Sequence, residues 1–337
     1  MVDDVCMNTC FSALVVRKND MGGYSQSIEQ RHILDLPKND VLIRVQYSSL
    51  NYKDCMSYVG NPGITRKFPH TPGLDAAGLV VASNSKNYKI GDEVIIVSRT
   101  IGVSSPGGFG QYLTCPADWL LHLPHGLSLR ESMIIGTAGF TAALAVDELL
   151  QSRISPDMGS ILVSGATGGV GLISIAILSK LGFKVSASTG KPEATKLLYS
   201  AGAAEVIDRE MVNDVSGRGL LSAKWIGGID TVGGNVLSTM LKGLKHEGTV
   251  VATGIIQSQD LNTSILPLVL RGVRLIGVNA EGKSHSVRSE IWGRIATIWK
   301  PLALEEISNE VCLKDLKICV EDMLNGRHSG RTIINLI

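Results

Sequence analysis

Two different patterns of hydrophobic and polar positions divide the chain. Up to about residue 124, short runs of apolar and β-branched residues are separated by Gly, Pro and Asn, which is typical of short strands joined by turns. Four such runs span residues 12–16, 41–47, 78–82 and 93–97. This part of the chain therefore predicts an antiparallel, barrel-like domain.

From residue 129 the spacing of the apolar residues changes. Residues 131–151 have the pattern of one long helix, after which short buried runs alternate with helical segments. Such alternation favours a parallel, doubly wound sheet. The predicted strands cover residues 161–164, 184–188, 205–207, 228–231, 249–253 and 274–278. Six strands are the number in a complete dinucleotide-binding fold.

The end of the chain is expected to return to the first domain. It contains an amphipathic stretch through Trp292 and Trp299, an extended run, a helix near residues 316–324 and a last strand at residues 332–336. The expected fold class is α/β, with a doubly wound parallel sheet of the Rossmann type and a mainly antiparallel β-barrel domain. The expected boundaries are 1–127 for the first part of the barrel domain, 128–280 for the Rossmann domain and 281–337 for the return.

A glycine-rich turn, Gly165-Ala-Thr-Gly-Gly-Val-Gly171, follows the first strand of the predicted sheet and opens a helix. Glycines at positions 165, 168 and 171 allow a tight turn, close approach of a pyrophosphate and close packing of the helix on the sheet. The N–H groups and the dipole at the helix N-terminus both favour phosphate. We expect a dinucleotide to bind at Gly165, Thr167, Gly168, Gly169, Val170 and Gly171.

The end of the second predicted strand distinguishes the two nicotinamide cofactors. An acidic residue there would accept from the ribose 2′-hydroxyl and repel a 2′-phosphate. From Val185 to Pro192 there is no acidic residue, and the first one is Glu193. Ser188 and Thr189 instead offer hydroxyls, and Lys191 offers a cation after Gly190. This set predicts NADPH rather than NADH. An ordinary solvated position of Lys191 is the alternative, because position alone does not fix where its amine points.

Two later turns also follow predicted strands of this sheet. They are Thr231-Val-Gly-Gly234 and Thr253-Gly-Ile255. Open α/β sheets bind ligands at the carboxyl ends of their strands. We therefore expect the ribose and nicotinamide to be lined by Val232, Gly254 and Ile255.

The composition of the chain indicates which partners it does not bind and in which cell compartment it is expected. Lys plus Arg number 32 and Asp plus Glu number 31, a formal net charge of +1, so no basic surface for nucleic acid or membrane is indicated. No stretch approaches the roughly 18 uninterrupted apolar residues of a membrane helix, and two aspartates near the start do not suit a signal peptide. The six cysteines contain no Cys-x-x-Cys pair. A cytoplasmic protein with reduced thiols is expected.

Several motifs, in the same order along the chain, resemble the medium-chain dehydrogenase/reductase superfamily. They are Ser48-Ser-Leu-Asn-Tyr-Lys-Asp54, Phe68-Pro-His-Thr-Pro-Gly-Leu-Asp-Ala-Ala-Gly78, Ile134-Ile-Gly-Thr-Ala-Gly-Phe-Thr-Ala142, the glycine turn, Thr189-Gly-Lys191 and Gly330-Arg-Thr332. Within this superfamily the chain is similar to the zinc-independent quinone oxidoreductase family, which includes NADPH-dependent acrylyl-CoA reductases. The resemblance implies a GroES-like barrel domain, a Rossmann domain and a homodimer joined through the edge of the nucleotide domain.

The chain departs from the zinc-bearing members of that superfamily. Those have a cysteine near the position of Asn51 and a Gly-His-Glu triplet where this chain has Gly73-Leu74-Asp75. The seven histidines also form no ligand cluster along the sequence, so no metal is expected. Without a metal as Lewis acid, reduction of an activated double bond is the expected chemistry.

The resemblance also suggests which residues meet the cofactor and substrate. It implies that Asn51 and Tyr52 face the nicotinamide, where an amide or a phenol holds the substrate or delivers a proton. For Tyr52, packing over the nicotinamide without proton transfer is the alternative, because an unperturbed phenol is a poor acid. It further implies that Asn279 and Arg331 lie near the cofactor, and that Arg331 reaches a phosphate unless it forms a surface salt bridge.

The expected reaction is hydride transfer from NADPH to a small enoyl-CoA, converting acrylyl-CoA to propionyl-CoA. A quinone reductase needs the same hydride donor and is the closest alternative, and an NADPH-binding protein with little catalysis is a third. Arg66 and Lys67 are candidates for contacts with CoA phosphates. Asp54 and Asp75 are expected to satisfy backbone donors rather than act as a base.

Overall fold

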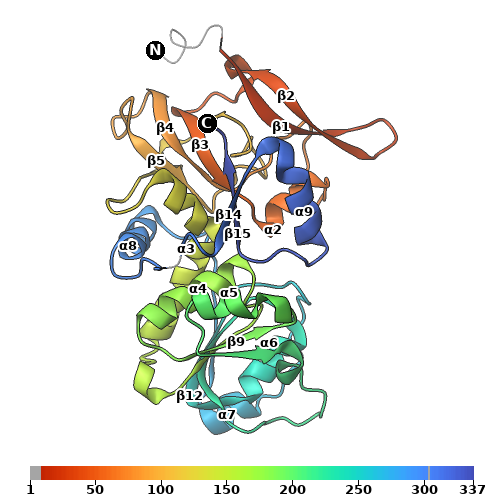
Figure 1. Ribbon diagram of the computed structural model, residues 1–337, viewed down its shortest axis with the longest axis vertical. Coiled ribbons are helices and arrows are strands. Elements are labelled where there is room, and N and C mark those ends of the chain that lie inside the picture. The colour runs from red at the N-terminus through yellow and green to blue at the C-terminus, as the bar shows by residue number, and fades with distance from the viewer. Residues whose placement is uncertain (1–8, 303) are drawn as a thin grey trace. The chain divides into compact units, whose positions relative to one another are not determined.

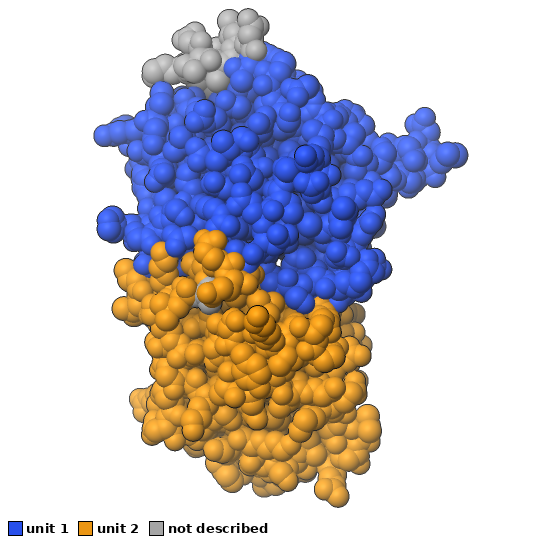
Figure 2. All heavy atoms as spheres, viewed as in Figure 1, with its two compact units in different colours: residues 1–137, 284–296, 308–337 blue, residues 138–283, 297–307 orange. Residues whose placement is uncertain are grey.

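The computed structural model describes residues 9–302 and 304–337. Cys6 and the start of the chain, where no signal peptide is predicted, therefore lie outside the described residues. The chain forms two compact units, coloured blue and orange in Figure 2. Unit 1 comprises residues 1–137, 284–296 and 308–337, and unit 2 comprises residues 138–283 and 297–307.

Unit 1 is built around a sheet in which β3 holds the central position. One edge of β3 pairs with β4, while the first half of its other edge pairs with β6 and the second half with β15. The described pairings in this sheet are antiparallel, apart from the parallel pair β14 and β15. Its strands are β3 (Val41–Ser49), β4 (Ala76–Ser83), β5 (Glu93–Ile96), β6 (Tyr112–Cys115), β7 (Leu121–His122), β14 (Ser308–Cys312) and β15 (Arg331–Asn335).

A hairpin, three whole α-helices and the first part of the long helix at residues 129–151 complete the described part of unit 1 (Figure 1). The hairpin consists of β1 (Cys10–Lys18) and β2 (Tyr24–His32), and the helices are α2 (Tyr52–Tyr58), α8 (His285–Ala296) and α9 (Leu316–Leu324). Apolar residues of β3, β4 and β5 form the core together with Cys55 of α2 and Leu316 of α9. The predicted tail thus supplies two strands, β14 and β15, and two helices, α8 and α9, to unit 1.

Unit 2 contains a six-stranded sheet in the order β10-β9-β8-β11-β12-β13, and every pairing in it is parallel. The predicted doubly wound sheet is therefore confirmed. The strand order reverses between β8 and β11, which is the position where such sheets bind their ligands. The strands are β8 (Ile161–Val163), β9 (Val185–Thr189), β10 (Glu205–Asp208), β11 (Trp225–Asp230), β12 (Leu244–Ala252) and β13 (Arg274–Gly277), with helices α4 (Gly169–Lys180), α5 (Thr195–Ser200), α6 (Gly234–Lys242) and α7 (Leu266–Arg271).

The long helix α3 (Leu129–Gln151) is interrupted, whereas the sequence predicts one continuous helix. Gly136 has φ 52° and ψ −158°, which no helical residue adopts. By length and composition α3 is also apolar enough to cross a membrane, and 72% of its most apolar window is buried within the protein. A largely buried core helix of a globular protein has the same composition.

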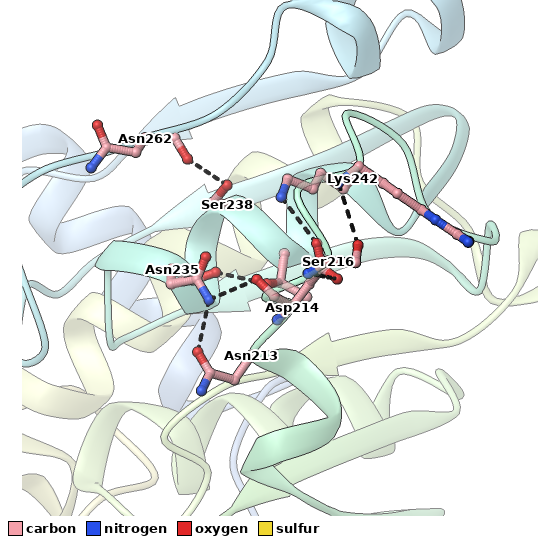
Figure 3. A network of polar contacts seen from close by, with 9 residues as sticks. Asn213, Asp214, Ser216, Asn235, Ser238, Lys242 and Asn262 are labelled. Atoms are coloured by element: carbon pink, nitrogen blue, oxygen red, sulfur yellow. Dashed lines mark hydrogen bonds and ion pairs between the residues drawn. The ribbon is translucent and has the colours of Figure 1, made fainter.

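Hydrogen bonds and an ion pair connect the segment between β10 and β11 to α6 (Figure 3). Lys242 Nζ lies 3.1 Å from Asp214 Oδ2. Asn235 Nδ2 donates to Asn213 Oδ1 at 2.8 Å and to the carbonyl oxygen of Asp214 at 3.0 Å. The N–H of Asp214 donates to Thr239 Oγ1 at 2.9 Å. These contacts satisfy polar groups of a segment that has little regular structure of its own.

Candidate active site

The residues predicted to bind a dinucleotide gather at one edge of the sheet in unit 2, with one exception, Arg331. Because the strands are parallel, their carboxyl ends meet at the same edge. The glycine turn follows β8, Ser188 and Thr189 end β9, and Gly190 and Lys191 follow it. Val232, Gly254, Ile255 and Asn279 follow β11, β12 and β13.

Hydrogen bonds connect the ends of neighbouring strands at this edge of the sheet. The N–H of Ala166 donates to the carbonyl of Ser188 at 3.1 Å, which joins the glycine turn to the end of β9. Ser164 Oγ donates to Asp230 Oδ1 at 2.6 Å, and the N–H of Gly233 donates to Asp230 Oδ2 at 2.8 Å. Burial raises the pKa of Asp230, although these donors oppose the shift. The hydrogen bonds therefore hold the turns after β8 and β11 in fixed positions.

The glycines of the turn have different physical roles. Gly165 has φ +55°, and a Cβ there would lie 2.2 Å from Thr231 Oγ1. A Cβ on Gly171 would lie 2.6 Å from the carbonyl oxygen of Gly165. Gly168 is exposed, and a Cβ there would meet only the carbonyl oxygen of Gly165, at 3.4 Å. Packing therefore requires Gly165 and Gly171, whereas Gly168 leaves room in front of the turn.

The N-terminus of α4 suits a bound phosphate group. No side chain caps this helix at Gly168, which lies just before its first residue. The first N–H groups of a helix lack partners within the helix and carry its positive dipole end. Together with the open face of Gly168, this arrangement fits the pyrophosphate of a dinucleotide.

At the end of β9, Ser188 and Thr189 are buried, and Thr189 Oγ1 accepts from the N–H of Lys191 at 3.0 Å. Lys191 is partly buried. Burial lowers the pKa of its amine, and the charge of Glu193 acts in the opposite direction. These two hydroxyls and one amine thus lie on consecutive residues around Gly190.

Sequence reasoning missed a second cation at this position, Arg209. The register of β9 and β10 pairs Thr189 with Asp208, so the next residue, Arg209, lies beside Gly190. A Cβ on Gly190 would be 2.7 Å from Arg209 Cδ and 2.9 Å from its Nε. The guanidinium lies 3.3 Å from Glu210, and both side chains are largely exposed. A basic residue directly after the third predicted strand is the signal that could have revealed it.

In unit 1, Asn51 and Tyr52 lie at the start of α2. The amide nitrogen of Asn51 donates to Asp75 Oδ2 at 2.9 Å and to Asp54 Oδ2 at 3.2 Å, while its oxygen accepts from Arg331 Nη1 at 3.2 Å. Two carboxylates on the nitrogen and a cation on the oxygen fix which way the amide points. Tyr52 is 46% exposed, and no hydrogen bond of its hydroxyl is recorded among the described residues.

Arg331 is buried in unit 1. Its Nε donates to the carbonyl of Ile134 at 2.8 Å, its Nη1 to the carbonyl of Leu50 at 3.3 Å and its Nη2 to Ser49 Oγ at 2.9 Å. Burial lowers the pKa of Arg331, whereas the charges of Asp75 and Asp54 raise it. Together with the oxygen of Asn51, these acceptors all belong to unit 1. A contact of Arg331 with a cofactor phosphate stays a prediction.

Asp54 is also buried and meets backbone donors, as expected from the sequence. It accepts from the N–H of Asn51 and from the N–H of Leu74, each at 2.8 Å. Next to it, Cys55 Sγ lies 3.4 Å from Met323 Sδ, and burial raises the pKa of the thiol. Both residues therefore support α2 from inside unit 1.

The described residues contain no group of three His, Cys, Asp or Glu side chains arranged to hold a metal ion. In the triplet Gly73-Leu74-Asp75, Leu74 is buried and Asp75 accepts hydrogen bonds from Ser49, Asn51 and Thr137.

The chain matches known families over both of its units. Residues 37–125 match the family described as alcohol dehydrogenase GroES-like domain, and residues 169–296 match the family described as zinc-binding dehydrogenase. The acrylyl-CoA reductase AcuI of Ruegeria pomeroyi is 39% identical over 97% of this chain and 99% of its own length. YhfP of Bacillus subtilis, which carries the name of a quinone oxidoreductase, is 42% identical over 98% of this chain and 100% of its own.

Solved structures agree with this assignment. The crystal structure of Bacillus subtilis YhfP with NAD bound has a TM-score of 0.94, and the matched regions cover 98% of this chain and 100% of that one. The YhdH oxidoreductase of Salmonella enterica in complex with NADP has a TM-score of 0.93 at 36% identity, with 97% and 100% covered. With these relatives matching over nearly the whole length, the chain belongs to the medium-chain dehydrogenase/reductase family of oxidoreductases.

Proposed function

We propose that this protein is an NADPH-dependent reductase that transfers hydride to the activated double bond of a small enoyl-CoA, converting acrylyl-CoA to propionyl-CoA. The observation that carries this proposal is the likeness to the acrylyl-CoA reductase AcuI along almost the whole of both chains. The open carboxyl edge of the sheet in unit 2 supports it, because it offers a dinucleotide both a phosphate cradle and a place for the ribose.

The residues of unit 2 fit NADPH. The pyrophosphate would be held at the glycine turn, where Gly168 leaves space and the N-terminus of α4 provides N–H donors. Lys191 and Arg209, on either side of Gly190, would hold the 2′-phosphate together with Ser188 and Thr189. Val232, Gly254, Ile255 and Asn279 would line the ribose and the nicotinamide.

Relatives differ in the cofactor named with them, since NAD is bound in the YhfP structure and NADP in the YhdH structure. The two cations beside Gly190, with no carboxylate at the end of β9 before Glu193, favour NADPH for this chain.

The nicotinamide of NADPH supplies the hydride, which adds to the electron-poor carbon of the conjugated thioester. The neighbouring carbon must then receive a proton, and Tyr52 is our candidate donor because its phenol is exposed and uncommitted to a recorded hydrogen bond. Asn51 lies directly before it and is held by charged side chains. In the alternative role, Tyr52 packs on the nicotinamide without transferring a proton.

Arg66 and Lys67 are proposed to contact the phosphates of CoA. Both are exposed, and no ion pair is recorded for either among the described residues. They lie shortly after α2, the helix that begins with Tyr52. Competitive inhibition of acrylyl-CoA reduction by free CoA, weakened in the double variant Arg66→Gln/Lys67→Gln, would support this contact.

A quinone reductase is the second candidate, favoured by the name of YhfP and its 42% identity. The test is NADPH oxidation with acrylyl-CoA and with 1,4-benzoquinone in parallel, each repeated with NADH. A larger kcat/KM for acrylyl-CoA supports the first proposal, and a larger value for the quinone supports the second. Saturable NADPH binding without turnover of either acceptor would instead identify a cofactor-binding protein with little catalysis.

We further propose a cytoplasmic homodimer joined through β13, the edge strand of the sheet in unit 2. Around this edge lie several exposed apolar side chains: Ile265 (63% exposed), Val269 (69%), Leu270 (57%) and Leu275 (39%). An exposed strand edge beside an apolar patch favours pairing with a second copy of the chain.

A further inference from the structure

The fully buried carboxylate of Asp75 is held by donors from separate segments of unit 1. Among the described residues, four hydrogen bonds reach it. Ser49 Oγ and Asn51 Nδ2 donate to Oδ2 at 2.6 and 2.9 Å, and Thr137 donates through its N–H to Oδ2 at 2.9 Å and through its hydroxyl to Oδ1 at 2.5 Å. A buried charge depends on such donors because no water replaces them. Thr137 supplies two of the four.

The interruption of α3 at Gly136 allows Thr137 to donate both of these hydrogen bonds to Asp75. In a continuous helix, the N–H of Thr137 would donate to the carbonyl four residues earlier. Instead Gly136 has φ +52°, and the N–H of the next residue meets Asp75. A Cβ at Gly136 would lie 2.6 Å from Asp75 Oδ2 and 2.8 Å from Ser49 Oγ. At Gly136-Thr137, the N–H of Thr137 therefore donates to the carboxylate of Asp75 in place of a hydrogen bond within the helix.

The direction of the Thr137 hydroxyl is also fixed. Its Oγ1 lies 2.7 Å from the backbone nitrogen of Ser98, and a backbone N–H can only donate. The single hydroxyl proton is therefore left for Asp75 Oδ1. Valine has a similar shape but can neither accept from Ser98 nor donate to Asp75, whereas serine can do both.

We propose that Thr137 is a positioning residue for the reductase reaction. It fixes Asp75, whose Oδ2 orients the amide of Asn51 at the start of α2. The carbonyl of Asn51 accepts from the N–H of Asp54 at 2.9 Å, and its N–H donates to Asp54 Oδ2 at 2.8 Å, so Asn51 is joined to the first turn of α2, in which Tyr52 lies. This inference rests on the proposed function, because it assigns Thr137 to the same reaction through Asn51 and Tyr52. Thr137 itself contacts protein groups and acts only through them.

The test compares Thr137→Val with Thr137→Ser and with a matched control, Thr114→Val. Thr114 is a buried threonine of β6 in unit 1, and its hydroxyl donates to the carbonyl of Pro37 at 2.7 Å. We expect Thr137→Val to lower kcat about tenfold or more while the Kd for NADPH changes less than about twofold. Thr137→Ser should restore kcat to within about threefold of wild type, and Thr114→Val should leave it unchanged.

A second readout does not depend on activity. In ¹⁵N NMR spectra, the side-chain amide of Asn51 is identified by the signal pair that disappears in Asn51→Asp. Hydrogen exchange of this pair should be faster in Thr137→Val and as in wild type in Thr137→Ser and Thr114→Val. Unchanged exchange in Thr137→Val, or equal loss of kcat in the Val and Ser variants, would overturn the inference. If wild type reduces neither acceptor, the proposed function fails, while the exchange rates still decide whether Thr137 orients Asn51.

Discussion

Asp54 and Asp75 accept hydrogen bonds from the same nitrogen, Nδ2 of Asn51, at 3.2 and 2.9 Å. Burial, reinforced by the nearby charge of Asp75, raises the pKa of Asp54 to about 7, although N–H donors from Asn51 and Leu74 oppose the shift. A single amide therefore connects two buried carboxylates, one of which changes its charge near neutral pH.

The raised pKa of Asp54 makes the stability of the protein depend on pH. Because this pKa lies above the value of about 3.9 in an unfolded chain, the folded state binds more protons between about pH 4 and 7. The free energy of unfolding should thus decrease, by a few kcal/mol at most, as the pH rises through this window. Urea unfolding at several pH values should show this slope in wild type and a smaller slope in Asp54→Asn. Asp20→Asn, in the exposed turn of the hairpin, should retain the wild-type slope, and equal slopes in all three proteins would contradict the prediction.

The glycine turn allows cofactor binding and stability to be separated. In Gly168→Ala the new methyl group meets little of the protein, so Tm should change by less than about 2 °C while the Kd for NADPH rises about tenfold or more. In Gly171→Ala the methyl group would collide with the carbonyl of Gly165, so Tm should fall clearly. Thermal unfolding without cofactor and fluorescence titration with NADPH measure the two effects. A fully stable Gly168→Ala that binds NADPH as wild type does would rule out a pyrophosphate at this turn.

Cofactor preference should depend on the two cations beside Gly190. We expect Lys191→Ala and Arg209→Gln each to raise the KM for NADPH about tenfold or more and the KM for NADH less than about twofold, because only NADPH carries the 2′-phosphate. Two variants serve as controls that remove a cation elsewhere in unit 2. Lys184→Gln lies just before the start of β9, at the end opposite Gly190, and Arg218→Gln lies beside Gly219, which is close to Leu266 of α7. Neither should change the preference for NADPH. Equal effects on both cofactors would remove these residues from the phosphate site.

The role of Tyr52 can be tested by removing one atom. If its hydroxyl donates the proton, Tyr52→Phe should lower kcat at least about tenfold without a matching rise in the KM for NADPH. Tyr58→Phe provides a comparison at the other end of α2, where the side chain is largely buried. A wild-type kcat in Tyr52→Phe would leave this residue a packing role.

The edge strand β13 should determine the oligomeric state. Replacing Leu275 on this strand and Val269 on α7 by Glu introduces charge into the exposed apolar patch. Light scattering should then give a monomer for the double variant and a dimer for wild type at micromolar concentration. Ile90 of unit 1 is about as exposed as Val269, and its replacement by Glu should leave the dimer intact. A wild-type monomer under these conditions would contradict the proposed dimer.

The sequence predicted those parts of the structure that depend on local pattern. Strand, glycine turn and helix follow one another in the stretch around Gly165, and the six parallel strands appear where apolar runs alternate with helical segments. The kink at Gly136 was missed because a helical pattern of apolar residues continues across it. At the kink the N–H of Thr137 donates to the carboxylate of Asp75, which is distant in sequence.

The parts that could not be predicted depend on register and on long-range contacts. Arg209 comes beside Gly190 only because β10 pairs with β9 in a particular register. Arg331 and Asn51 are 280 residues apart, and no spacing in the sequence indicates that the guanidinium donates to the amide. The family resemblance predicted that Asn51 and Tyr52 both lie at the site. Only the structure shows that they differ, because the amide of Asn51 is hydrogen-bonded to Asp75 whereas the side chain of Tyr52 is exposed.

The position of β15 between β14 and β3 has a consequence for the order in which the protein forms during synthesis. The ribosome makes Asp54, Asp75 and Thr137 long before it makes residues 331–335. Until that strand emerges, the carboxylates have no guanidinium near them and the second half of β3 lacks one neighbour. A nascent chain stalled before Arg331 should therefore keep this region of unit 1 open to solvent and to proteases, even though every residue of the sheet in unit 2 has already been translated.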